Sequence, residues 1–187
     1  MKSTKVVFPA VDDAEHVVNV DGGVAEDDGT FFLTVDGMDC PIQEPTPFSK
    51  TWFSHKFKGP AIKHEIAIDL NGNFAWVSPP HRGSANDKAI FDRELRQLIP
   101  AGCLVICDKG CDADDVLAPH DEVDDDEAKC FKARALARHE TGNKRVKDFA
   151  ITSTHFRDGV EFHCAAFDAV VVLCQCDIQR GEPLFEL

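Results

Sequence analysis

The sequence lacks several features that would point to other classes of protein. Its eight cysteines form no Cys-x-x-Cys pair, and no histidine joins them at zinc-finger spacing, so a structural zinc site has little support. No apolar core of a signal peptide is present, and the longest apolar segment, residues 165–176, contains Asp168 and is too short to span a bilayer. We therefore expect an intracellular protein with reduced, buried thiols and no membrane anchor.

Positive charge is also scarce. Twenty Lys and Arg stand against 33 Asp and Glu, for a formal net charge of −13. This balance argues against non-specific nucleic-acid binding by the whole surface but leaves room for a local basic face. Residues 1–29 are acidic and weakly patterned, so we expect a poorly ordered lead-in there and one globular domain over residues 30–187.

The hydrophobic pattern predicts an α/β domain with a mixed sheet. Strands are expected over residues 31–35, 64–70, 74–77 and 103–107, with a hairpin turn at 71–73. Helices are expected over about 86–98, 128–149 and 159–178, and an acidic loop over 112–127. The order of strand, hairpin, helix, strand, helix and helix favours a mixed sheet flanked by helices.

Two of these strands run directly into an aspartate. Asp36 follows the first strand and Asp108 the last, and ligands of α/β proteins bind beyond the carboxyl ends of strands. Glu140 stands among cations in a predicted helix. Three carboxylates from separate elements suit two Mg²⁺ ions that clamp an in-line phosphoryl displacement. The alternatives are that Asp36 caps a turn, and that 33 acidic residues assemble such a triad by chance.

Residues 51–60 interleave aromatic and basic side chains. This composition suits a surface that follows a nucleic-acid backbone, and the alternative is an ordinary hairpin with exposed lysines. His139, beside Glu140, is interpreted as a helix-surface residue, with a contact to phosphate or a role in proton transfer as the alternative. Asp39 is interpreted as a turn residue close to Asp36.

Four motifs occur in an order that resembles DDE superfamily endonucleases. They are Val35-Asp-Gly-Met-Asp-Cys-Pro-Ile42, Trp52-Phe-Ser-His-Lys-Phe-Lys-Gly-Pro60, Ile106-Cys-Asp-Lys-Gly110 and Ala137-Arg-His-Glu-Thr-Gly-Asn-Lys-Arg-Val-Lys147. The resemblance is to transposase-derived domains of the Harbinger-like type and covers roughly residues 31–184. It implies an RNase H-like fold and a nuclease that cuts DNA at transposon ends.

The resemblance also implies roles for particular residues. Asp36, Asp108 and Glu140 match the acidic triad, which binds Mg²⁺ or Mn²⁺, and Asp87 is a secondary candidate ligand. Matching positions imply DNA contact or support of the site for His55, Lys56, Lys58, Lys109, Arg138, Asn143, Lys144 and Lys147.

Some positions depart from the family pattern. Cys111 and Phe53 stand where the family often has Tyr, and Met38 replaces a residue that is often small and polar. Residues 1–29 are too short and acidic for the upstream helix-turn-helix region of such transposases, so the chain resembles a catalytic domain alone, whose DNA recognition is either lost or supplied by a separate DNA-recognition protein. The alternative is a domesticated or degenerate module that binds DNA or protein without cleavage. A DNA substrate implies a nuclear location if the source is eukaryotic.

Overall fold

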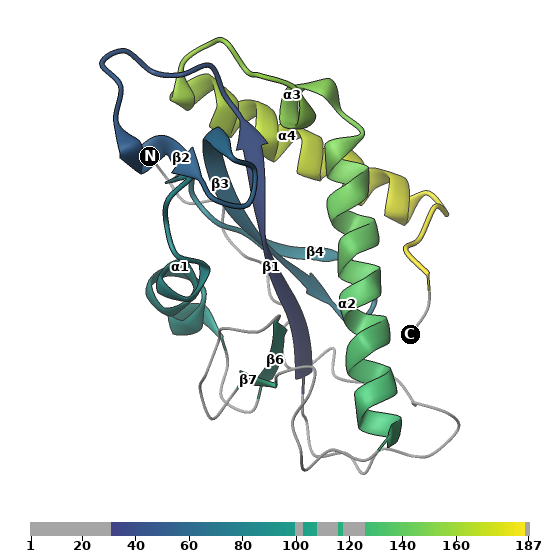
Figure 1. Cartoon of the computed structure of the whole chain (residues 1–187). Coiled ribbons are helices and arrows are strands. Elements are labelled where there is room, and N and C mark those ends of the chain that lie inside the picture. The colour runs from purple at the N-terminus through teal and green to yellow at the C-terminus, as the bar shows by residue number, and fades with distance from the viewer. Residues whose placement is uncertain (1–30, 100–102, 108–115, 118–125, 186–187) are drawn as a thin grey trace.

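A mixed sheet runs through the centre of the domain (Figure 1). The computed structural model describes residues 31–99, 103–107, 116–117 and 126–185. The strands are β1 (Phe31–Pro41), β2 (Phe53–Ser54), β3 (Gly59–Asp69), β4 (Phe74–Val77), β5 (His81–Arg82), β6 (Cys103–Cys107) and β7 (Val116–Leu117). The helices are α1 (Asp87–Glu94), α2 (Asp126–Lys147), α3 (Ala150–Ser153) and α4 (Val160–Gln179), with 3-10 turns η2 (Lys50–Trp52) and η3 (Arg96–Leu98).

The strand order confirms the predicted α/β class. It is β2-β3-β1-β6-β7, and β4 and β5 also pair with β3. β1 runs antiparallel to β3 but parallel to β6, and β6 is parallel to β7. The parallel pairs require crossover connections, which here include α1 between β4 and β6. The result is the mixed sheet flanked by helices that the RNase H-like resemblance implies.

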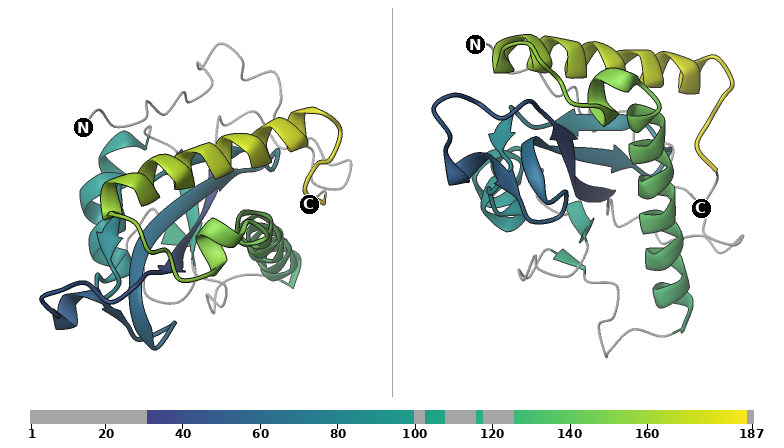
Figure 2. Two further views of the ribbon diagram at one scale, coloured as in Figure 1. Left: turned by 90° about the horizontal axis from the view of Figure 1, so that it is seen from above. Right: turned by 45° about the horizontal axis from the view of Figure 1, so that its top comes forward.

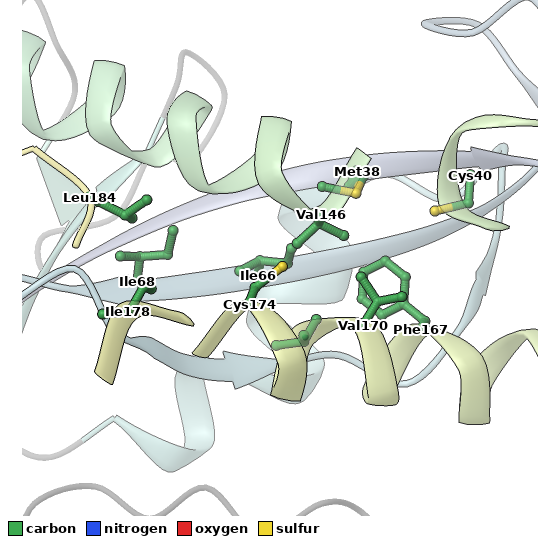
Figure 3. Packing of buried hydrophobic residues seen from close by; sticks show 11 residues of the cluster. Met38, Cys40, Ile66, Ile68, Val146, Phe167, Val170, Cys174, Ile178 and Leu184 are labelled. Carbon is green, nitrogen blue, oxygen red and sulfur yellow. The ribbon is translucent and has the colours of Figure 1, made fainter. Parts of the chain in front are cut away.

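Helices cover both faces of the sheet (Figure 2). Side chains alternate along a strand, so Met38 and Ile66 point to one face and pack with Val146 of α2 and Phe167 of α4 (Figure 3). Val35 and its neighbours point to the other face and pack with α1 and the residues after it, through Val35, Ala67, Trp76, Phe91, Leu95 and Val105. The two clusters therefore hold α2 and α4 on one side of β1 and α1 on the other.

Turn and capping residues in the sequence predicted the positions of several elements correctly. The β3–β4 turn has Gly72 at φ +84, a conformation that favours glycine. Asn86 caps α1 by accepting a 3.1 Å hydrogen bond from the Ala89 backbone N–H. The predicted boundaries of α2 and α4 lie within about two residues of those observed. β2, β5, β7 and α3 were not predicted, because elements of two to four residues carry little pattern.

Residues 1–30 lie outside the described part of the chain, as does most of the expected acidic loop over residues 112–127. In the described segments every cysteine is a free thiol, and most of them are buried. No helix among the described residues is long and apolar enough to cross a membrane.

Candidate active site

Asp36 lies inside β1, so the predictions that it ends the strand or caps a turn are wrong. β1 continues to Pro41, and Val35 opposite Cys107 is the last described pair of its ladder with β6. The strand continues because Met38 is buried in the core. Asp36 therefore lies just past the carboxyl end of the neighbouring strand β6.

The Asp36 carboxylate faces α2. Its Oδ2 accepts a 2.9 Å hydrogen bond from Asn143 Nδ2, which lies 107 residues further along the chain. The side chain is 20% exposed. Burial raises the pKa of Asp36 above the usual range. The charge of Lys56 and the Gly37 backbone N–H oppose this rise, and the charge of Glu140 adds to it.

Helix α2 presents Glu140 and Asn143 to the same region. Residues three apart lie on one helix face, and Glu140 is exposed while Asn143 is buried. The charge of Glu140 contributes to the raised pKa of Asp36, so the two carboxylates lie within electrostatic range. The Asn143 amide Oδ1 is buried and has no hydrogen-bond partner among the described residues. The fold thus gathers two of the three predicted carboxylates beside an oxygen without a partner.

Lys56 brings a positive charge to these carboxylates. Its Nζ lies 3.9 Å from Asp36 Oδ1 and donates a 3.2 Å hydrogen bond to the Gly37 carbonyl oxygen. The Lys56 side chain is 64% exposed. An ammonium on such a solvated stem is free to move from the carboxylate to an incoming phosphate.

A buried hydrogen-bond chain holds the hairpin that carries Lys56. Ser54 Oγ donates to Asp39 Oδ2 at 2.8 Å and accepts from the Phe57 backbone N–H at 3.0 Å. The interpretation of Asp39 as a turn residue is wrong, because Asp39 lies within β1 and is buried. Asp39 instead anchors the β2–β3 hairpin to the strand that carries Asp36.

Asp87 lies beside β1 but has a partner of its own. Lys63 Nζ donates to Asp87 Oδ1 at 2.5 Å and to the Ala85 carbonyl oxygen at 2.9 Å. A Cβ at Gly37 would stand 3.1 Å from the Asp87 carboxyl atoms, so glycine at this position admits Asp87. Alternation along β1 directs residue 37 away from the face to which Asp36 points. Asp87 thus approaches from the α1 side, and its role as a secondary ligand stays a prediction.

Asp108 and Lys109, predicted as the second acidic residue and a DNA contact, lie outside the described residues. The strand before them is described. Its last residue, Cys107, is paired in parallel register with Val35, the residue before Asp36. The strand that contains Asp36 and the strand that precedes Asp108 in the sequence are therefore neighbours in the sheet.

The remaining predicted DNA contacts fall into exposed and buried groups. The exposed ones lie on the β2–β3 hairpin and the last turns of α2, and are His55, Lys56, Lys58, Lys144 and Lys147. The alternative reading of residues 51–60 as a hairpin with exposed lysines describes their structure correctly. It does not conflict with DNA contact, because exposed lysines are available to phosphate.

Arg138 and His139 are buried, so neither presents its side chain at the surface. The Arg138 guanidinium donates to the Leu70 and Asp69 carbonyl oxygens, at 2.5 and 2.7 Å, and so ties α2 to the end of β3. His139 Nδ1 lies 2.9 Å from Thr34 Oγ1. The interpretation of His139 as a surface residue is wrong. The contacts of Arg138 give it a structural role, which agrees with support of the site, and its contact with DNA stays a prediction.

A comparison with known families agrees with this geometry. Residues 35–175 match the DDE superfamily endonuclease family. The chain belongs to this family. Neither a curated protein nor a solved structure gives a significant match. The match includes Asp36 and Glu140 and identifies the domain as a transposase-like nuclease domain whose family implies a DNA substrate.

DDE superfamily endonucleases generally use divalent metal ions. Among the described residues no group of three His, Cys, Asp or Glu side chains is close enough to hold a metal. The groups that are present nevertheless fit one. Asp36 and Glu140 repel each other in a partly buried site, and Asn143 Oδ1 has no partner. Oxygen donors of this kind suit Mg²⁺ or Mn²⁺, and a divalent cation would relieve the repulsion.

Proposed function

We propose that this domain is a divalent-metal-dependent DNA endonuclease or transposase catalytic domain that hydrolyses or transfers phosphodiester bonds. Asp36, Asp108 and Glu140 would hold two Mg²⁺ or Mn²⁺ ions. The observation that supports this best is the approach of α2 to β1, which joins Asp36 to Asn143 by a hydrogen bond and brings Glu140 within electrostatic range. In a eukaryotic cell such a protein would work in the nucleus.

Each residue around the site has a separate task in this proposal. Bound divalent ions would lower the pKa of the attacking water or DNA hydroxyl, and would stabilise negative charge on the leaving oxygen. Asn143 holds the Asp36 carboxylate in position through its 2.9 Å hydrogen bond. Lys56, which is already beside Asp36, is placed to pair with a phosphate oxygen of the DNA strand.

The proposal is tested by nicking of supercoiled DNA with Mn²⁺, Mg²⁺ or a chelator. Asp36→Asn and Glu140→Gln should abolish metal-dependent nicking, which the parent protein and the matched surface control Glu161→Gln should retain. Glu161 is exposed in the first turn of α4. Equal nicking by parent and site variants would refute the assignment of the site.

If no nicking is seen, calorimetric titration with Mn²⁺ distinguishes an intact metal site from a degenerate one. Metal binding that Asp36→Asn removes would indicate an intact site that needs a recognition partner or a longer chain. A parent protein that neither nicks DNA nor binds metal would favour the alternative, a degenerate transposase-derived module that binds DNA or protein without cleavage.

A further inference from the structure

A segment between α3 and α4 is joined to the chain just after β1 by an isolated β-bridge. Ile42, the residue after β1, forms a parallel bridge with Phe156. The Gln43 N–H donates a 2.7 Å hydrogen bond to the Phe156 carbonyl oxygen. The Phe156 N–H donates a 3.0 Å hydrogen bond to the Pro41 carbonyl oxygen. These bonds fix the position of residues 155–157 relative to the strand that carries Asp36.

A cavity of about 420 Å³ opens beside this bridge, lined by Gln43, Glu44, His155 and Arg157. All four side chains are exposed, whereas Phe156 packs against a buried histidine. The alternation of side chains along the bridge explains why residues 155 and 157 share the outer face. The guanidinium of Arg157, the imidazole of His155 and the amide of Gln43 all supply donors to one open cavity.

Arg157 supplies the full positive charge among the residues that line this cavity. Within residues 31–99, 103–107, 116–117 and 126–185, Arg157 forms no ion pair. Cations on α1 are paired, as Arg93 is with Glu94 at 2.9 Å. In a chain of net charge −13, an exposed guanidinium beside an imidazole and an amide in one cavity is a set of donors suited to an external anion.

The cavity is connected to the candidate active site. The Phe57 ring contacts the His155 ring edge-on, with 6.0 Å between centroids, and the neighbouring Lys56 reaches Asp36. From Asp36 to Ile42 the chain advances six residues along β1, or about 20 Å at about 3.3 Å per residue. This length corresponds to about six base pairs of duplex DNA at 3.4 Å each.

We propose that Arg157 and His155, with Gln43, bind backbone phosphates of the DNA about six base pairs from the bond that is cut. This inference rests on the proposed function, since it extends the path of the same DNA strand. Arg157 pairs with a phosphate oxygen, and His155 and Gln43 donate hydrogen bonds beside it. Glu44 lines the same cavity, and its negative charge limits the affinity for phosphate.

The test measures binding of a fluorescent duplex of about 30 base pairs by anisotropy, in chelator, over a series of salt concentrations. Loss of one phosphate contact should weaken binding about 8-fold near 0.1 M salt and reduce the slope of log K against log salt by about 0.9. Arg157→Ala should show both changes. Glu44→Gln should bind more tightly than the parent, because it removes a repulsive charge and keeps a similar shape.

Arg180→Ala is the matched control, since Arg180 is an exposed arginine after the far end of α4. It should leave both the affinity and the slope unchanged. If the parent binds DNA and both Arg157→Ala and Glu44→Gln behave like Arg180→Ala, the phosphate site is refuted while the proposed function stands. If the parent binds no DNA in chelator, the phosphate site is refuted, while metal-dependent nicking and Mn²⁺ binding decide the proposed function separately.

Discussion

Replacing His163 by Phe should make the stability of the domain less sensitive to acid. His163 is fully buried on α4. It lies against the ring of Phe156, at 5.1 Å between centroids, and is stacked near His64 at 5.5 Å. Neither of its ring nitrogens has a hydrogen-bond partner in the described part of the chain. Burial lowers the pKa of His163 from 6.5 to about 4.

The sign of the effect follows from this lowered pKa. As the pH falls below about 6.5, the unfolded chain takes up a proton at residue 163 while the folded protein stays neutral there. The stability that neutral His163 provides above this pH is therefore lost progressively down to about pH 4. Each pH unit is worth at most about 1.4 kcal/mol, so between pH 6.5 and 5 the loss is about 1 to 2 kcal/mol after allowance for solvent screening.

Urea unfolding followed by tryptophan fluorescence, at several pH values in reducing, metal-free buffer, measures this loss. The free energy of unfolding of the parent should fall relative to that of His163→Phe by about 1 to 2 kcal/mol from pH 6.5 to 5. His64, whose pKa burial lowers to about 3, is present in both proteins, so the main part of its contribution, which comes from burial, is common to both. His155→Phe, at an exposed position, is the control and should follow the parent. Parallel pH curves for the parent and His163→Phe would refute the reasoning.

Three further substitutions test the site and the hairpin. Because burial raises the pKa of Asp36, Asp36→Asn should increase the melting temperature in metal-free buffer at neutral pH, and the increase should disappear in acid, where the carboxylate is protonated. Ser54→Ala removes the donor to buried Asp39 and should cost about 1–3 kcal/mol of stability in urea unfolding. Gly83→Ala places a Cβ 2.6 Å from the Trp52 carbonyl oxygen and should cost a similar amount, about 1–3 kcal/mol by thermal unfolding; unchanged stability would contradict that contact.

Predictions from the sequence succeeded where the signal was local. The turn before β4 follows from Asn71-Gly72-Asn73, and the start of α1 follows from Asn86, because turns and helix caps depend on a few adjacent residues. The family motifs also identified the family correctly, while the catalytic roles of Asp36 and Glu140 stay predictions.

Predictions failed where burial depends on distant segments. Residues 37–41 include Gly, Asp and Pro and resemble a turn, but they continue β1 because β3 pairs with them along their whole length. His139 and Arg138 lie in a charged stretch that resembles an exposed helix face, but α2 turns them toward Thr34 and the end of β3. No pattern within α2 specifies which of its polar faces will meet the sheet.

The sequence by itself therefore determined the α/β class, the main helices and the identity of the family, since these depend on periodicity and on motifs in order. Only the tertiary structure decided that Asn143 holds Asp36, that Asp87 pairs with Lys63, and that His155 contacts the hairpin that carries Lys56. Each of these contacts joins residues more than 20 positions apart, and their geometry depends on how the helices and loops pack on the sheet.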